Sequence, residues 1–135
     1  MFSEQRVTLL TILGIFFLIF FTQNALGADP FGSLDTPADG STVRGTIPVS
    51  GWVLDDVEVA HVKIYRNDGG SLVYLGDGAL VEGARPDVAA VYPHYPDSQK
   101  AGWSFSMPTH FLPDGGNSSY TIHVIATDND ANQMT

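Results

Sequence analysis

The chain has 135 residues, a formal net charge of −9 and no cysteine. This acidic balance argues against binding to nucleic acid or to anionic membrane surfaces, although it permits binding of divalent cations. Because disulfides and cysteine-linked lipids are both excluded, a folded domain must depend on its apolar core, which is feasible for one domain of this length.

The N-terminus has the pattern of a secretory signal peptide. Arg6 precedes an apolar run over residues 7–21, and small residues follow. The run is shorter than the ~20 residues that a membrane-spanning helix needs, which favours cleavage before Ala28 over retention as an uncleaved anchor helix. We therefore expect a signal peptide at 1–27 and a single domain at 28–135, in a protein that is secreted or held at the cell surface.

The rest of the chain alternates between apolar and polar residues in short runs separated by turn clusters, which is typical of an all-β sandwich. Five runs are predicted to be strands: 46–54, 59–66, 71–78, 102–107 and 120–128. The sequence "NDGG" between the second and third runs predicts a tight hairpin. Pro48 lacks a backbone donor, so we expect a bulge or the start of a strand there.

One side of each run supplies the predicted core. Its members are Ile47, Val49, Val53, Val62, Ile64, Trp103, Phe105, Met107, Tyr120, Ile122, Val124 and Ala126. Tyr120 also stands two residues before the inward Ile122, which is the arrangement of a tyrosine corner.

A segment around 84–101 breaks the strand pattern. It contains "RPDVAAVYPHYPDS", in which Pro86 suits the first position of a short helix, while residues before the later prolines avoid the helical region. So long an insertion is unusual for a plain loop and predicts either a packed cap on the sandwich or a binding loop. Trp52 faces away from the core row, and we expect the insertion to cover it.

Aromatic residues flank this insertion and form a candidate ligand-binding set. Tyr92, Tyr95 and Trp103 could stack on sugar rings, because proline-rich loops hold such rings rigidly. In the alternative interpretation, Trp103 belongs to the core strand and the two tyrosines fix the loop.

Three stretches resemble a known family: "VSGWVLDD", "ARPDVAAVYPHYPDSQKAGWSF" and "IHVIATDNDANQ". They are similar to the bacterial immunoglobulin-like modules of exported, multi-domain surface proteins, and the resemblance covers Pro30 to Thr135. It implies a sandwich of about seven strands that serves as a spacer, adhesion or substrate-attachment module, and it implies no catalytic residues.

The sequence departs from the family pattern at its end. After "DNDAN" a final strand should pair with "YTIHVIA", but only "QMT" is present. We therefore expect the last strand to be missing and the sandwich to be C-terminally truncated, as in a fragment of a longer protein. The alternative is a strand donated by a partner, as in pilus assembly.

In an immunoglobulin-like sandwich, the loop after the second strand and the loop before the last strand lie at the same end. Asp55, Asp56, Asp128, Asp130 and Asn132 could therefore converge as oxygen ligands for Ca²⁺. The last three copy the start of a calcium-binding loop, but its glycine and distal glutamate are absent. In the alternative interpretation, these residues are present because they form turns.

Taken together, these patterns predict a non-catalytic, secreted immunoglobulin-like module that acts as a structural spacer or an adhesion domain of a larger protein. The alternatives are a carbohydrate-binding module that uses the aromatic insertion, and an accessory domain of an exported enzyme lying beyond Thr135. Expected partners are other domains of the same longer chain and a glycan or protein ligand, with membrane contact only through an uncleaved N-terminal segment. No cofactor other than Ca²⁺ is expected.

Overall fold

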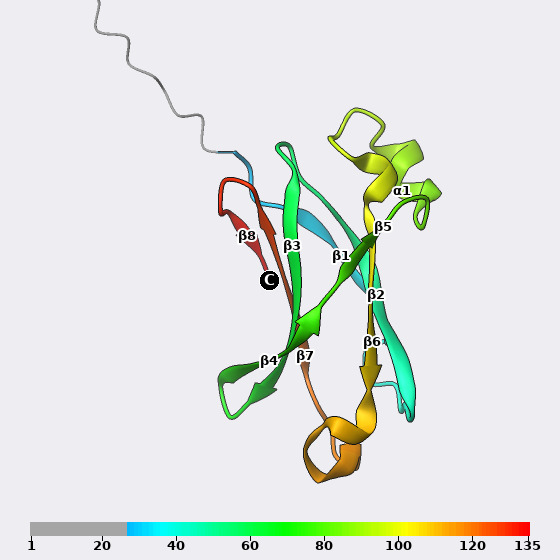
Figure 1. The fold of residues 1–135 in the computed structure, drawn as a ribbon, viewed down its shortest axis with the longest axis vertical. Helices are drawn as coiled ribbons and strands as arrows, with labels where there is room; N and C mark the ends of the chain where they lie inside the picture. The colour runs from blue at the N-terminus through cyan, green and yellow to red at the C-terminus, as the bar shows by residue number, and fades with distance from the viewer. Residues whose placement is uncertain (1–26) are drawn as a thin grey trace, which may run out of the picture.

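The computed structural model describes residues 27–135, which form two four-stranded sheets packed face to face (Figure 1). The predicted signal peptide lies outside the described residues except for its last residue, Gly27. Within the described part of the chain, no helix has both the length and the apolar character needed to cross a membrane.

Both sheets are antiparallel. In spatial order, sheet A contains β1 (Phe31–Thr36), β2 (Thr46–Leu54), β6 (Gly102–Pro108) and β5 (Ala79–Val81). Sheet B contains β4 (Ser71–Asp77), β3 (Val59–Asp68), β7 (Ile122–Asp128) and β8 (Gln133–Met134). The helical pieces are α1 (Pro86–Val91) and the 3₁₀ turns η1 (Ser98–Lys100), η2 (Thr109–Phe111) and η3 (Pro113–Gly116).

The five predicted strands are confirmed as β2, β3, β4, β6 and β7. The "NDGG" hairpin is also confirmed: Asp68 pairs with Ser71, and the two glycines between them have φ values of 60° and 93°. These positive values suit a tight two-residue hairpin and are accessible to glycine at little cost.

The sequence missed β1 and β5, and the prediction that the last strand is missing was wrong. Gln133 and Met134 pair with Thr127 and Ala126, so a two-residue β8 is present and the described strands number eight rather than about seven. The sequence could not reveal β8, because apolar alternation is recognisable only over about four or more residues and β8 has two.

The expectation for Pro48 was also wrong. It pairs with Ser106 in an unbroken register, with neither a bulge nor a strand start at that position. The physical reason is that β1 reaches only as far as Ser50 along β2, so β2 has a single neighbour beside Pro48. A proline is tolerated where one side of its strand carries no ladder.

The predicted core is confirmed between the two sheets. Its buried members are Val49, Val53, Val62, Ile64, Trp103, Met107, Val124 and Ala126, and the remaining predicted residues pack against them half-buried. Leu112, which was not predicted, is buried in the same cluster. The tyrosine corner is confirmed as well, because the Tyr120 hydroxyl donates to the backbone carbonyl of Pro113.

The chain changes sheets between β4 and β5. Only Gly78 separates β4 in sheet B from β5 in sheet A, and its backbone N–H donates to the carbonyl of Val62 over 2.8 Å. A methyl group at Gly78 would lie 3.1 Å from both the Trp103 ring and the Val62 side chain, and one at Gly76 would overlap the Phe105 ring. Glycine is therefore needed where the crossing strand passes over the core.

Candidate functional site

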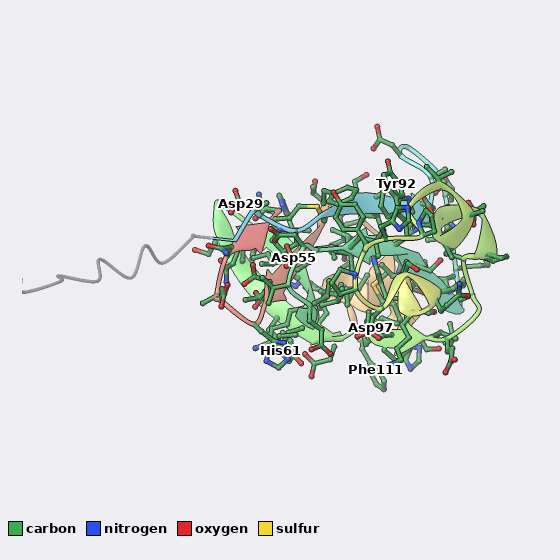
Figure 2. All side chains as sticks on the ribbon, turned by 90° about the horizontal axis from the view of Figure 1, so that it is seen from above. Asp29, Asp55, His61, Tyr92, Asp97 and Phe111 are labelled. Atoms are coloured by element: carbon green, nitrogen blue, oxygen red, sulfur yellow. The ribbon has the colours of Figure 1, made fainter. Side chains whose placement is uncertain are left out.

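The two acidic loops lie at the same end of the sandwich. The Asn129 backbone N–H, in the β7–β8 turn, donates to the carbonyl of Glu58 in the β2–β3 loop over 3.0 Å. The Asn129 side-chain amide donates to Glu58 Oε2 over 3.1 Å. These bonds bring the predicted calcium-ligand loops together, and Figure 2 shows Asp29 and Asp55 in the left half of the domain.

Asp128 organises the β7–β8 turn. Its side chain is buried, and Oδ1 accepts the backbone N–H groups of Asp130 and Asn132, each over 2.8 Å. Oδ2 accepts the Asn132 side-chain amide over 2.8 Å. Burial tends to raise the pKa of Asp128, but the hydrogen bonds from Asn132, Asp130 and Ala131 outweigh burial and hold the pKa below its ordinary value. The carboxylate therefore stabilises the turn through bonds within the chain.

Asp55 has the same role in the β2–β3 loop, with one difference. It is 1% exposed, and its Oδ2 accepts the Val57 backbone N–H over 2.8 Å. Its Oδ1 is buried and has no hydrogen-bond partner among the described residues. Asp55 is thus an aspartate turn with one oxygen unused.

Asp56 and Asp130 are exposed and flank the start of the described chain. Asp56 Oδ1 accepts the Ala28 backbone N–H over 3.1 Å. A methyl group built at Gly27 would lie 3.3 Å from Asp130 Oδ2 and 3.4 Å from Asp56 Oδ1. Across residues 27–135, however, no three acidic or histidine side chains are grouped so that they could hold a metal ion. The calcium site stays a prediction, and the hydrogen bonds support the turn interpretation.

The aromatic residues of the insertion form a closed cluster with sheet A, which we call the aromatic cap: Phe31, Trp52, Tyr92 and Tyr95. The Phe31 ring meets the other three edge-on, at centroid distances of 5.2–5.7 Å. Tyr92 stacks on Trp52 at 5.9 Å and meets Tyr95 edge-on at 5.7 Å. Because the rings contact one another, the stacking partners that a sugar would need are largely occupied.

The insertion therefore packs as a cap, and Trp52 is covered as expected. Val88 and Ala101 are buried against Leu54 beneath the aromatic cap. The helix α1 begins at Pro86, also as predicted, and Figure 2 shows Tyr92 beside this segment. Trp103 does not belong to the cap: it is 3% exposed and packs between the sheets, so it adds no ring to a stacking surface at the insertion.

Arg85 fixes the start of the insertion to an edge strand. Its guanidinium donates to both carboxylate oxygens of Asp87, at 2.9 and 2.7 Å, and to Asp35 Oδ2 of β1 at 2.5 Å. The hydrogen bonds from Arg85 lower the pKa of Asp87 to about 2, and those bonds also raise the pKa of Arg85. This cluster was not predicted from the sequence, although "ARPD" places two of its members only two residues apart.

Four side chains have shifted pKa values, and each pKa is moved further away from pH 7. Asp87 and Asp128 are lowered, while Arg85 and Tyr74 are raised, the latter because Asp77 accepts a hydrogen bond from its hydroxyl. A general acid or base needs a pKa near the working pH, so none of these four groups is prepared for proton transfer. Their shifts indicate roles in holding the fold.

The described surface has a hollow at one edge of the sandwich, which we call the edge groove. It has a volume of about 250 Å³ and lies between β1 and the β7–β8 pair. It is lined by Gly32, Ser33, Leu34, Trp103, Ile122, His123, Val124, Met134 and Thr135. A second hollow beside Pro96 and Lys100 has a volume of only about 20 Å³, enough for a single water. The groove was not predictable from the sequence, because its walls come from segments that are far apart along the chain.

Comparison with known proteins agrees with this architecture. A family model described as a bacterial Ig domain matches residues 30–124, which is more than half of the chain. No curated protein and no solved structure matches the chain.

Proposed function

Because the chain belongs to the bacterial Ig domain family, we propose that it is a non-catalytic structural or adhesion module of an exported, multi-domain surface protein. Domains of this family are usually found on exported proteins, and they are typically non-catalytic. The signal-peptide pattern before Ala28 supports the same location. Its partners would be neighbouring domains of the same polypeptide or a surface ligand.

The observation that carries this proposal is the packing of the insertion. In many domains a long loop at a sandwich face forms a binding site, but here the loop buries Val88 and Ala101 on sheet A and encloses its tyrosines among other rings. Arg85 then attaches the start of the loop to β1 through Asp35. The insertion thus adds a packed layer to the outer face of sheet A and leaves no open loop for a substrate. This suits a module that acts as a structural spacer rather than as a catalyst.

Binding to a glycan array tests the structural role against the carbohydrate-binding alternative. The secreted protein and a Tyr92→Ala variant are applied at equal concentration, with Tyr74→Ala as the matched control, because Tyr74 is an exposed tyrosine on the other sheet. We expect no glycan to be retained by any of them. Retention by the wild type and the Tyr74 variant, lost in the Tyr92 variant, would establish the carbohydrate-binding function instead.

Export is tested on whole cells that express the full chain. We expect the mature protein outside the cytoplasm, with Ala28 as its first residue by N-terminal sequencing. Surface material that still begins at Met1 would instead establish an uncleaved anchor, and material confined to the cytoplasm would contradict the proposal.

A further inference from the structure

The backbone of Gly27 and Ala28 runs between the two acidic loops. In the β2–β3 loop, Asp56 Oδ1 accepts the Ala28 backbone N–H over 3.1 Å. In the β7–β8 turn, the Asn132 side-chain amide donates to the Gly27 carbonyl over 3.4 Å. The peptide that joins Gly27 to Ala28 is therefore held by one side chain from each loop.

The register of β1 fixes the Ala28 nitrogen beside Asp56. Phe31, the first residue of β1, pairs with Leu54 of β2, and Pro30 before it is buried. In an antiparallel pair, each step back along one strand is matched by a step forward along the other. The residues just before Phe31 therefore lie alongside the residues just after Leu54, which include Asp56.

Both loops that hold this peptide are acidic. A methyl group built at Gly27 would lie 3.3 Å from Asp130 Oδ2 and 3.4 Å from Asp56 Oδ1, so a carboxylate from each loop lies next to residue 27. Residues 55–58 and 128–132 contain no lysine, arginine or histidine, and no basic side chain of the described chain forms a salt bridge with Asp56 or Asp130. The other ionisable groups on these segments are all acidic: Asp29, Asp55, Glu58 and Asp128.

Signal-peptide cleavage would place a positive charge at this point. When water hydrolyses the bond between Gly27 and Ala28, its hydroxyl goes to the Gly27 carbonyl carbon and its hydrogen to the Ala28 nitrogen, which then takes up a proton and becomes an α-ammonium. We propose that Asp56 and Asp130 form a binding site for this ammonium, so that the acidic end of the sandwich binds the chain's own mature N-terminus. The inference rests on the export and cleavage proposed above.

Cleavage strengthens a contact that is already present. The Ala28 nitrogen already donates to Asp56, and a hydrogen bond between two charged groups is shorter and stronger than one from a neutral amide. The bond from Asn132 to the Gly27 carbonyl is lost, but at 3.4 Å it is longer than ordinary N–H···O bonds. The space that Gly27 leaves adjoins Asp130 Oδ2, so the ammonium can donate to a second carboxylate there.

An ammonium fits these loops better than a metal ion does. Ca²⁺ requires about six to eight oxygen ligands, and across residues 27–135 no three acidic or histidine side chains are grouped to hold a metal. An ammonium needs only a few acceptors with free lone pairs, which two exposed carboxylates supply. Because the precursor has an uncharged amide at the same place, only the processed chain gains the ion pair. Cleavage therefore stabilises the N-terminal end of the mature domain.

The test measures the pKa of the α-amine in the secreted protein, by NMR, from the chemical shift of the Ala28 methyl group between about pH 6 and pH 10. The ordinary pKa is about 7.7–8.0, and we expect it to be raised by about 0.5 unit or more, because nearby negative charges favour the charged form. Asp56→Asn keeps an oxygen acceptor but removes the charge, and should lower this pKa by about 0.3 unit or more.

Asp39→Asn is the matched control. Asp39 is exposed in the turn after β1, at the opposite end of that strand, and the substitution changes the net charge by the same amount. It should leave the pKa of the α-amine within about 0.1 unit of the wild-type value, because charges so far apart in water are largely screened. Equal shifts in the two variants would mean that only the overall charge acts, and would overturn the site.

Stability gives a second measurement. A group whose pKa is raised in the folded state stabilises the fold below its ordinary pKa, and this contribution is lost as the pH rises through the folded value. The difference in melting temperature between the wild type and Asp56→Asn should therefore be larger at about pH 6.5 than at about pH 10, and should become smaller in about 1 M NaCl. A difference that is independent of pH and salt would indicate only a neutral hydrogen bond and would contradict the proposal.

N-terminal sequencing of the same samples separates two kinds of failure. If the chain begins at Ala28 but its α-amine has an ordinary pKa that Asp56→Asn does not change, the ammonium site is wrong while the proposed export stands. If the secreted chain begins at another residue, the predicted cleavage is wrong and the ammonium site is overturned with it.

Discussion

The two faces of sheet A are built from the same strands but are covered in different ways. On β2, Val49 and Val53 face sheet B and are closed off by the whole sandwich, whereas Trp52 and Leu54 face the insertion. The inner face is packed mainly with aliphatic side chains from both sheets. The outer face places one buried leucine beneath four aromatic rings that are themselves only partly buried.

The inner face of sheet A holds the two sheets together, whereas the outer face only adds stability to a sandwich that is already formed. The inner face gathers residues from strands far apart in sequence, so its loss removes the reason for the sheets to associate. The outer face depends on one segment of about 18 residues and on the ion pairs of Arg85. We therefore expect damage to the core to unfold the domain and damage to the cap to weaken it by less.

The largest effect should come from the inter-sheet core. Ile64 is fully buried, and Ile64→Ala should lower the free energy of unfolding by about 2–5 kcal/mol through lost burial and a residual cavity. Urea denaturation measures it. Leu72→Ala, at an exposed position, is the control and should cost no more than about 0.5 kcal/mol. Equal costs at the two positions would show that the core is misplaced.

A smaller effect should come from the aromatic cap. Tyr92→Ala removes one stacked and two edge-on ring contacts and should cost about 1–3 kcal/mol. Tyr92→Phe keeps the ring and should be nearly neutral in the same urea titration. If Tyr92→Ala lowered the free energy of unfolding by as much as Ile64→Ala or more, the outer face would matter as much as the inner face, against our expectation.

The β7–β8 turn gives a comparison within the acidic loops. Asp128→Ala leaves the N–H groups of Asp130 and Asn132 without their acceptor and should lower the urea midpoint, whereas Asp130→Ala should change it little. Since the pKa of Asp128 is lowered in the folded state, its contribution is present above its ordinary pKa and is lost as the pH falls through the folded value. The difference in urea midpoint between the wild type and Asp128→Ala should therefore become smaller at acidic pH.

The Arg85 cluster should contribute less still, because its groups are partly solvated. The pKa of Asp87 falls from 3.8 to about 2, so the stabilisation is complete above about pH 4 and is lost as the pH falls through about 2. Thermal unfolding should place Arg85→Gln below the wild type at pH 6, with the two converging near pH 2. Lys100→Gln, at the more exposed pair with Asp97, is the matched control and should lower the melting temperature at pH 6 by less than Arg85→Gln does.

Added Ca²⁺ should have the smallest effect of all. The oxygens of Asp128 already accept three hydrogen bonds within the chain, so we expect the melting temperature to respond to Ca²⁺ no differently from Mg²⁺. Calorimetry with and without EDTA measures this. A rise specific to Ca²⁺ that disappears in Asp128→Asn would establish the calcium site and show that the turn rearranges to bind the ion.

The sequence predicts the inner face well because alternation over seven or more residues identifies both strand and burial, as in β2 and β7. It misses β1, where "FGSLDT" has only two large apolar residues and is extended because β2 pairs with it. β5 and β8 are too short to alternate. Edge strands of this kind follow from tertiary pairing, which local propensity does not encode.

The candidate site was less predictable for a related reason. The sequence correctly places the two acidic loops at one end, since that follows from the topology of the resembled fold. It cannot show that the Asp128 oxygens are taken by Asn132 and Asp130, because that depends on the backbone path of a four-residue turn. Trp103 could be interpreted either as a core residue or as a ligand-binding ring, because its strand carries aromatic residues on one side and adjoins the aromatic insertion.

The passage of the chain from β4 to β5 through Gly78 has a mechanical consequence. One continuous stretch of backbone is hydrogen-bonded first into sheet B and then into sheet A, with a single residue between them. If one sheet slid over the other, it would strain the backbone around Gly78 and the hydrogen bonds of both sheets at the same time. Under a stretching force, we therefore expect the two sheets to be coupled at Gly78 and to yield together rather than one after the other.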